Sequence, residues 1–217
     1  MKNLLYKELK LAASPLSYFF ILFAFMTMIP GYPILVGVFF VCFGIFHTFQ
    51  SARENSDTIY TALLPIKKRD VVSARYFFIL AIEGTAFFLD VILTLLRMLF
   101  LRDAVAYTNN VMMNANFVYL GYVLIIYGVF NYFFVTGFYK TAYAIGKPFL
   151  FFGILSFVIV GIGETFHHIP RCIWMNATEP EQLARQLFIF VIGVILCMIL
   201  TMMGWKKSQK LFETIDL

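Results

Sequence analysis

The sequence predicts an all-α polytopic membrane protein with six transmembrane helices and both termini in the cytoplasm. Of its 217 residues, 61% are hydrophobic and 13% are charged, whereas soluble domains have about 45–50% apolar and about 25% charged residues. The apolar residues form continuous runs, whereas the strands of a β-barrel alternate apolar and polar residues, so a barrel is disfavoured. The basic residues flank these runs, as topology signals do in membrane proteins.

Six apolar segments come close to the ~20 residues that a helix needs to cross the hydrocarbon core of a bilayer. They are residues 16–30, 34–49, 76–101, 117–138, 149–165 and 187–205. The first two are short, and only Gly31, Tyr32 and Pro33 join them. We therefore expect either a tight hairpin here or spans that extend beyond these bounds.

The distribution of lysine and arginine predicts the orientation. With the N-terminus inside, the cytoplasmic segments hold 13 of these residues and the outer segments hold 4. The inner set is Lys2, Lys7, Lys10, Arg53, Lys67, Lys68, Arg69, Arg75, Lys140, Lys147, Lys206, Lys207 and Lys210, and the outer set is Arg97, Arg102, Arg171 and Arg185. Because cytoplasmic loops carry an excess of basic residues, an N-in, C-in topology is favoured.

Two segments on the expected cytoplasmic side have helical patterns of their own. In residues 1–13, leucines alternate with charged residues at roughly helical spacing, which predicts an amphipathic helix on the inner membrane surface. The alternative is a frayed tail. Residues 50–75 form the largest cytoplasmic segment, with apolar side chains at helical spacing before Pro65 and a basic cluster after it. A plain linker would not need those apolar residues, so we expect a short helix with one face on protein or membrane.

The third span carries three charged residues at a seven-residue spacing, namely Glu83, Asp90 and Arg97. Seven residues are nearly two helical turns, so the three side chains share one face of the helix. Such residues at membrane depth usually face a bundle interior or a wet cavity. This stripe, with Tyr127 and Asn131 of the fourth span, would line a translocation path or a subunit interface. The alternative is that each residue is satisfied by a neighbouring helix, purely for assembly.

The sequence has neither a phosphate-binding loop nor a dinucleotide fingerprint, so the chain is not expected to bind ATP in the usual way by itself. No catalytic residue and no resident metal or cofactor is expected. Glu164, His167 and His168 lie close together near the outer end of the fifth span and leave an intramembrane metal-dependent hydrolase as an alternative. The net charge of +5 belongs to membrane-flanking residues, so no nucleic-acid partner is expected.

The stretch from Tyr60 to Val72, with Leu64 and Pro65 followed by basic residues before the third span, resembles permease subunits of ABC-2 type transporters. The tail from Ser208 to Glu213 is also similar to the tails of that family. The resemblance extends over the whole chain in length and span count. Within the family, the chain is most similar to small six-span bacterial permeases such as the membrane subunit of the phenol-soluble modulin exporter.

The resemblance implies one transmembrane permease domain over residues 1–217, in the cytoplasmic membrane of a bacterium. Two such chains, identical or related, would pair with two copies of a separate ATPase that holds ATP and magnesium. Residues 1–13 would be the connecting helix, and residues 50–75 would contain the coupling helix that docks on the ATPase. The implied coupling residues are Glu54, Asp57, Tyr60, Leu63, Leu64, Pro65, Arg69 and Lys140, and those of the connecting helix are Tyr6, Lys7 and Glu8.

The resulting hypothesis is an exporter permease that moves an amphipathic peptide, lipid or drug outward with ATP hydrolysed by its partner. Two alternatives stay open: the metal-dependent hydrolase, and a membrane protein for immunity or assembly that binds without transporting. Metal in the purified protein would favour the first alternative, and ATP-dependent transport in vesicles would exclude the second.

Overall fold

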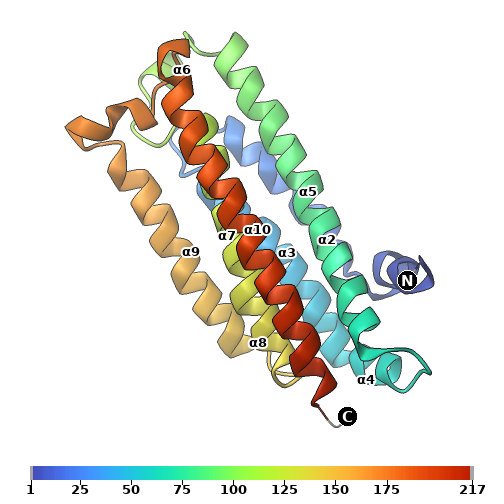
Figure 1. The fold of residues 1–217 in the computed structure, drawn as a ribbon. Coiled ribbons are helices and arrows are strands. Elements are labelled where there is room, and N and C mark those ends of the chain that lie inside the picture. Colours follow the sequence, from blue (N-terminus) through green and yellow to red (C-terminus); the bar gives the residue numbers. More distant parts are fainter. Residues whose placement is uncertain (1, 216–217) are drawn as a thin grey trace.

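The computed structural model describes residues 2–215, and within this range every regular element is a helix (Figure 1). The all-α polytopic fold expected from the sequence is therefore confirmed. The longer elements are α3 (Leu35–Glu54), α5 (Lys68–Phe100), α7 (Phe117–Val129), α9 (Gly146–Phe166) and α10 (Leu183–Glu213). The shorter ones are α1 (Lys2–Lys7), η1 (Glu8–Ala12), α2 (Pro15–Phe19), η2 (Phe20–Met28), α4 (Asp57–Ala62), α6 (Val105–Thr108), η3 (Phe130–Val135), α8 (Thr136–Tyr139), η4 (Pro170–Met175) and η5 (Pro180–Gln182).

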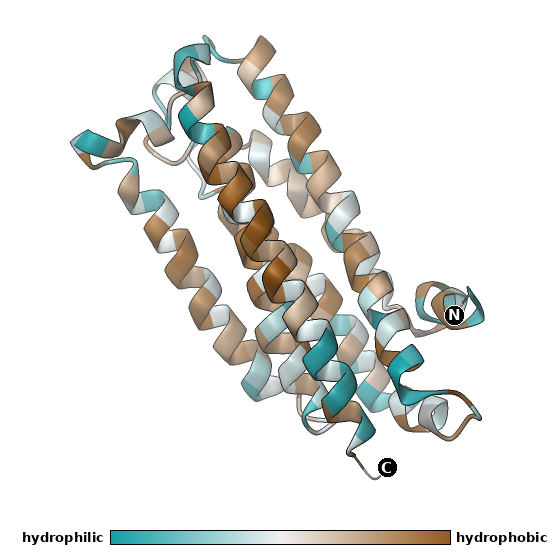
Figure 2. Cartoon of the chain, viewed as in Figure 1, coloured by the Kyte–Doolittle hydropathy of each residue, from teal (hydrophilic) through white to brown (hydrophobic). Residues whose placement is uncertain are grey.

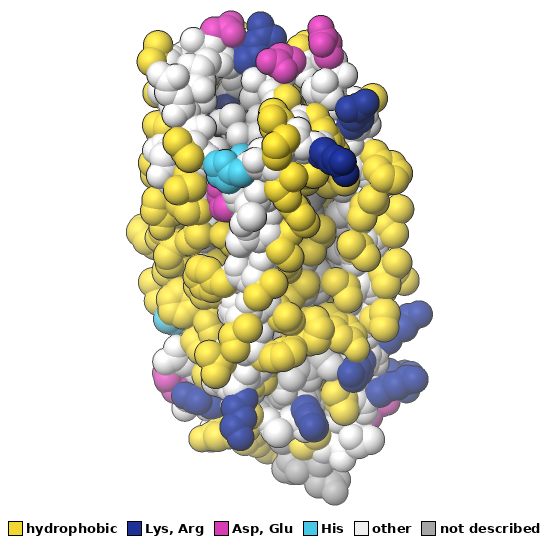
Figure 3. All heavy atoms as spheres, turned by 90° about the vertical axis from the view of Figure 1, so that its left-hand side faces the viewer, with side chains coloured by type: hydrophobic (Ala, Val, Ile, Leu, Met, Phe, Trp, Pro, Cys, Tyr) yellow, Lys and Arg dark blue, Asp and Glu magenta, His cyan; other side chains and the backbone are white. Residues whose placement is uncertain are grey.

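Five helical stretches within residues 2–215 are long and apolar enough to cross a membrane, and a sixth span is possible at the N-terminus. Hydrophobic residues cover the middle of the bundle in Figure 2, and hydrophilic residues gather toward its ends. Figure 3 shows the same division in space, with a broad apolar belt and most of the visible lysine and arginine side chains below it. The pattern is that of a bundle whose belt faces lipid.

Residues 2–28 form two helices set at right angles, and the second of them, α2 with η2, corresponds to the expected first span. Lys2–Ala12 and Pro15–Met28 meet at 90°, and Ser14 caps the second helix by accepting a hydrogen bond from the Leu16 amide at 3.3 Å. The segment expected to be an amphipathic helix is thus helical rather than frayed. Pro15 at the first helical position suits the new direction because its ring presets the helical φ and it has no N–H to satisfy.

The first span has few residues, but most of them form a 3-10 helix, which is longer per residue than an α-helix. η2 is a 3-10 helix of nine residues, which rises ~2.0 Å per residue, whereas the five residues of α2 rise ~1.5 Å each. Together they cover about 25 Å, close to the ~30 Å thickness of the hydrocarbon core. The stretched geometry explains how 14 residues nearly match a thickness that would otherwise need about 20.

Several spans extend beyond their expected bounds. α3 continues to Glu54, and α5 begins at Lys68, eight residues before the expected start of the third span. The free part of the segment expected at residues 50–75 is therefore only 55–67, with α4 inside it. α10 likewise continues through the tail to Glu213. The residues by which these helices are longer than expected include many charged side chains at one end of the bundle. The expected spans were drawn from apolar runs, so they left these residues out.

α7 and α10 approach each other closely at a pair of glycines. A Cβ on Gly193 would lie 2.5–2.9 Å from three backbone atoms of Gly121. Small residues allow such close backbone approach in membrane bundles, where helix association depends on packing and hydrogen bonds. The crossing holds α10 against the middle of the bundle.

We predict that Gly193→Ala lowers stability by about 1–3 kcal/mol, because overpacking forces the two backbones apart. Gly161→Ala is the matched control, since a Cβ at Gly161 of α9 has nothing within 4 Å. Thermal unfolding of the purified protein in detergent, followed by tryptophan fluorescence, measures both variants. Equal midpoints for the two variants would contradict the close crossing.

The bundle has two distinct ends. α4, the turn from α8 to α9, and both termini lie at one end, here called the α4 end, and α6 lies at the other, here called the α6 end (Figure 1). In the expected orientation the α4 end is cytoplasmic. The two ends are described separately below because they carry different chemistry.

Candidate functional site

The α4 end presents an exposed apolar surface, here called the α4 patch, made of Ile59, Tyr60, Leu63 and Leu64. Their exposed fractions run from 40% for Ile59 to 70% for Leu63. Ser56 begins α4 in the left-handed conformation with φ of 51°, so the helix turns sharply away from the end of α3. Pro65 follows the patch and is also exposed. Large apolar side chains on a short helix outside the bundle are typical of a protein or membrane contact.

Behind the patch, α4 is anchored by charged residues from three elements, here called the Arg75 cluster: Lys7, Glu8, Asp57 and Arg75. Arg75 Nε lies 2.6 Å from Glu8 Oε2, and Arg75 Nη2 lies 3.0 Å from Asp57 Oδ2. Lys7 Nζ lies 2.6 Å from the same Asp57 oxygen and 3.1 Å from Glu8 Oε1. Two bases and two acids thus balance, and one guanidinium joins the N-terminal helix to α4.

Glu8 and Arg75 are almost fully buried, at 1% and 4% exposure. A buried ion is tolerated only when it is paired and hydrogen-bonded, because leaving water is costly. Arg75 also lies over the Phe49 ring, with Cζ 5.4 Å from the ring centroid. Since Arg75 belongs to α5, the cluster joins α4 to a helix of 33 residues.

The sequence prediction included Lys7, Glu8 and Asp57 but missed Arg75 as a member of this site. Arg75 is 67 residues from Glu8 and 18 from Asp57 along the chain. Its position directly before an apolar run looked like an ordinary topology signal. One signal in the sequence could have identified Arg75: Glu8 and Asp57, on two segments expected at the same end of the bundle, each needed a basic partner.

The other residues expected at the coupling site are exposed at the same end. Glu54 accepts a hydrogen bond from Gln50 at 3.0 Å, and Arg69 forms an ion pair with Glu213 of α10 at 2.5 Å. Lys140 is exposed in the turn between α8 and α9. That turn adjoins α3, because Arg53 Cζ lies 5.7 Å from the ring centroid of Tyr143. The two cytoplasmic segments expected to act together are therefore neighbours. Tyr6 of the N-terminal helix is exposed and takes no part in the Arg75 cluster.

The charged stripe of α5 lies inside the bundle. Glu83, Asp90 and Arg97 are each 4% exposed or less. Glu83 accepts a hydrogen bond from Asn131 Nδ2 at 2.9 Å, and that nitrogen lies 3.2 Å from Thr201 Oγ1.

The two other residues of the stripe, Asp90 and Arg97, both form hydrogen bonds with Thr27 of the first span. Asp90 accepts hydrogen bonds from the hydroxyls of Thr27 and Tyr119, both at 3.0 Å. Arg97 donates to the Thr27 carbonyl at 2.6 Å and to Asn114 Oδ1 at 3.2 Å.

This placement bears on the roles expected for the stripe. Glu83, Asp90 and Arg97 are buried within the single chain, and a role at a subunit interface stays a proposal. The hydrogen bonds are of the kind expected if the residues serve assembly. They tie α5 to η2, η3 and α7, and Asn131 of η3 in turn contacts Thr201 of α10. A path role would require these helices to separate, and it stays a proposal.

We predict that Asn131→Leu destabilises the bundle by about 1–3 kcal/mol, because it leaves the buried Glu83 carboxyl without its donor. Tyr127→Phe is the control, since the Tyr127 hydroxyl is buried and has no hydrogen-bond partner within residues 2–215. We expect no loss of thermal stability from that variant. Similar losses for both would show that the Glu83–Asn131 contact is not a stabilising interaction.

The alternative metal site is not assembled within the described part of the chain. No group of three His, Cys, Asp or Glu side chains there has a geometry that could hold a metal ion. Glu164 Oε2 instead accepts a hydrogen bond from the Met113 amide at 2.9 Å. Both ring nitrogens of His167 face backbone carbonyls, those of Gly163 and Val111. These residues fasten the loop before α7 to the end of α9.

The fold and the α4 end define a polytopic membrane protein with an exposed apolar surface outside the bundle. The family model for the ABC-2 family transporter protein matches residues 3–213, so the chain belongs to that family. It is therefore a permease subunit of an ABC transporter, a class that works with an ABC ATPase. No curated protein and no solved structure matches the chain.

Proposed function

We propose that the chain is the permease of an ABC exporter and that α4 is its coupling helix. The observation that carries this proposal is the α4 patch, which is exposed to a partner and joined through the Arg75 cluster to α5. An ATPase groove that covers the patch would bury four large apolar side chains. Such anchors supply most of the affinity in protein interfaces.

The Arg75 cluster supports a route for the motion. Nucleotide-driven closure of the ATPase would move α4, and α4 is held to α5 and to the N-terminal helix through Asp57, Arg75 and Glu8. α5 has 33 residues and passes through the whole bundle. Movement at the α4 end would thereby reach the α6 end as a rigid-body tilt rather than as local bending. The buried stripe would open as a polar path when α5 separates from α7 and α10.

In the proposed transporter, two permease chains pair with two ATPase subunits in the cytoplasmic membrane of a bacterium. The cargo is an amphipathic peptide, lipid or drug, and it moves outward. The resemblance to small peptide-exporting permeases supports this cargo class. Lys140 and Tyr143 add a second contact with the ATPase, next to Arg53 of α3.

Co-expression with ABC ATPase subunits of the same genome tests the proposal. We expect one of them to co-purify with the chain in detergent and to hydrolyse ATP in the complex. Inside-out vesicles that contain the complex should then accumulate an amphipathic fluorescent peptide only when ATP is present. A stable complex that hydrolyses ATP without moving any amphipathic cargo would overturn the exporter assignment.

A further inference from the structure

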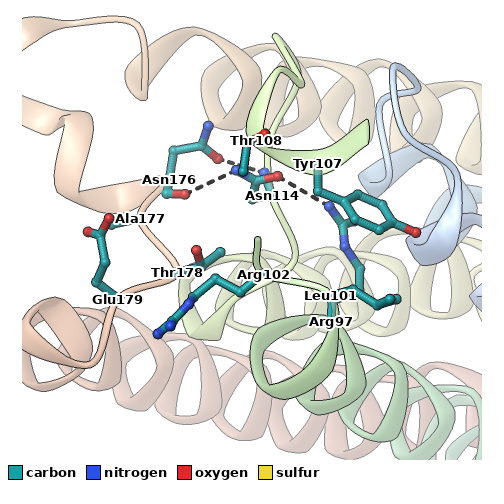
Figure 4. A pocket seen from close by; sticks show the side chains of 10 residues that line it. All are labelled: Arg97, Leu101, Arg102, Tyr107, Thr108, Asn114, Asn176, Ala177, Thr178 and Glu179. Atoms are coloured by element: carbon teal, nitrogen blue, oxygen red, sulfur yellow. Dashed lines mark hydrogen bonds between the residues drawn. The ribbon is translucent and has the colours of Figure 1, made fainter. Parts of the chain in front are cut away.

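The α6 end contains a polar cavity of about 290 Å³ that the proposed coupling does not use (Figure 4). In Figure 4, Arg97 and Tyr107 lie on one side, Arg102, Thr178, Glu179 and Asn176 lie on the other, and Asn114 lies between Tyr107 and Asn176. Asn114 N donates to Asn176 Oδ1 at 2.6 Å, which holds the two loops together. The wall of the cavity is therefore held in place by hydrogen bonds between the two loops.

The partners of Arg97 in this cavity are all uncharged. Its guanidinium is held by the Thr27 carbonyl, by Asn114 Oδ1 and by the Tyr107 ring, whose centroid lies 4.2 Å from Arg97 Cζ. Within residues 2–215, no carboxylate lies within 4.0 Å of it. Buried charges in proteins are normally paired, so this cation favours an anionic ligand.

Arg102 supplies a second positive charge to the same cavity. Its side chain is 41% exposed and lies 3.3 Å from the exposed Asp103, a contact that water screens strongly. Glu179 is the acidic residue in the lining. Two guanidiniums against one carboxylate leave the cavity positive, which suits a phosphate group because guanidiniums bind phosphate oxygens in a forked geometry.

An apolar groove of about 410 Å³ adjoins the polar cavity and shares Arg102 and Thr178 with it. The rest of the groove is lined by Leu95, Met98, Leu99, Phe117, Pro180 and Leu183. A head group bound between the two arginines would therefore have its chain next to α5 and α10. The combination matches a molecule with a phosphate at one end and a hydrocarbon chain at the other.

The depth of the cavity in the membrane agrees with a lipid ligand. Arg97 follows Arg75 by 22 residues on the same helix, which is ~33 Å at 1.5 Å per residue. The hydrocarbon core is ~30 Å thick, so when Arg75 lies at one interface Arg97 lies at the other. The cavity is then level with the head groups, and Leu95 of the adjoining groove lies on the bilayer side of Arg97.

We propose that this cavity and groove bind a phospholipid of the leaflet at the α6 end, with its phosphate between Arg97 and Arg102 and one acyl chain in the groove. In the expected orientation this is the outer leaflet. The inference does not rest on the proposed coupling, because it uses residues at the opposite end and needs no ATPase.

The test measures binding of phosphatidylglycerol to the purified full-length chain by native mass spectrometry from detergent. Diacylglycerol with the same chains is the probe without a phosphate, and inorganic phosphate is the probe without a chain. We expect phosphatidylglycerol to bind about fivefold or more tightly than diacylglycerol, since one charge near an anionic head group is worth ~1 kcal/mol. Equal binding of the two lipids would contradict the proposal that the cavity binds the phosphate. Displacement of phosphatidylglycerol by equimolar inorganic phosphate would contradict the proposal that the groove binds an acyl chain.

Two arginine variants and one control complete the test. Arg102→Gln should weaken phosphatidylglycerol binding about fivefold without affecting folding, because Arg102 is half-exposed. Arg97→Gln should weaken it further, and its fold is checked by size-exclusion chromatography. Arg171→Gln is the control, since Arg171 is exposed at the same end and lines neither the cavity nor the groove. Unchanged binding in Arg102→Gln, or an equal loss in Arg171→Gln, would overturn the proposal even if Arg97→Gln fails to fold.

Discussion

The double variant Tyr60→Ala with Leu63→Asp is expected to abolish co-purification of the ATPase with the permease. Tyr60 and Leu63 are 68% and 70% exposed, so the bundle itself loses little packing when they change. Central interface residues often contribute ~2 kcal/mol or more each, and an aspartate in their place would be buried without a partner. A loss of ~4 kcal/mol corresponds to an affinity about 1,000-fold lower.

The measurement is the amount of ATPase retained on affinity-purified permease, together with the ATP hydrolysis of the eluate. The matched control is Val105→Asp with Ile173→Ala, which changes two similarly exposed apolar residues at the α6 end. We expect the control to keep the ATPase. Retention of the ATPase by the α4 variant would remove α4 as the docking element, and equal loss in both variants would indicate a general defect of insertion.

The second large effect is expected for Arg75→Met. Removing the guanidinium takes away the 2.6 Å partner of Glu8 and leaves Lys7 as the one base of the cluster for both Glu8 and Asp57. Breaking a buried ion pair by removing one member costs about 3–5 kcal/mol, and here the buried Glu8 carboxylate would have to share Lys7 with Asp57. We therefore expect a clearly lower thermal midpoint in detergent.

Two comparisons separate this effect from a general loss of charge. Glu8→Gln combined with Arg75→Met should be less destabilising than Arg75→Met alone, because the stranded carboxylate is gone. Arg69→Met is the positional control: Arg69 lies on the same helix, but its ion pair with Glu213 is solvent-exposed. We expect its thermal midpoint to be unchanged. An additive double variant would show that Glu8 and Arg75 do not stabilise each other.

Arg75→Met also tests the mechanism. The α4 patch is unchanged in this variant, so the ATPase should still bind. Transport per ATP hydrolysed should fall, because α4 is no longer held to α5 through Asp57. A variant with normal transport per ATP would show that motion reaches the bundle by another contact, for example the turn that carries Lys140.

The fold class and the apolar face of α4 could be predicted from the sequence because they depend on local properties. Continuous apolar runs require lipid as their solvent, and the helical spacing around Tyr60 and Leu63 marks one face of a short helix. The chain bends at Ser14 and Pro15, between the predicted amphipathic helix over residues 1–13 and the predicted first span. Each of these signals lies within about 20 residues of chain.

The candidate site was only partly predictable for the same reason. Glu8 and Arg75 are 67 residues apart, and Asp90 meets Thr27 across 63 residues, so no local pattern marks either pair. The stripe of α5 was recognised from its spacing, but spacing cannot tell whether such a face meets another chain or the interior of its own bundle. The hydrogen bonds of Glu83 and Asp90 place it in the interior.

The sequence by itself determined that this chain is a helical membrane protein with an apolar coupling-like segment beside its third span. Hydrophobicity and helical period are carried by neighbouring residues, so they can be recognised without a fold. Only the tertiary structure decided that the first span is stretched into a 3-10 helix, that Arg75 anchors α4, and that Arg97 lies in a cavity without an acidic partner. These features depend on which distant side chains meet, and the packing of the whole bundle decides which residues from different helices come into contact.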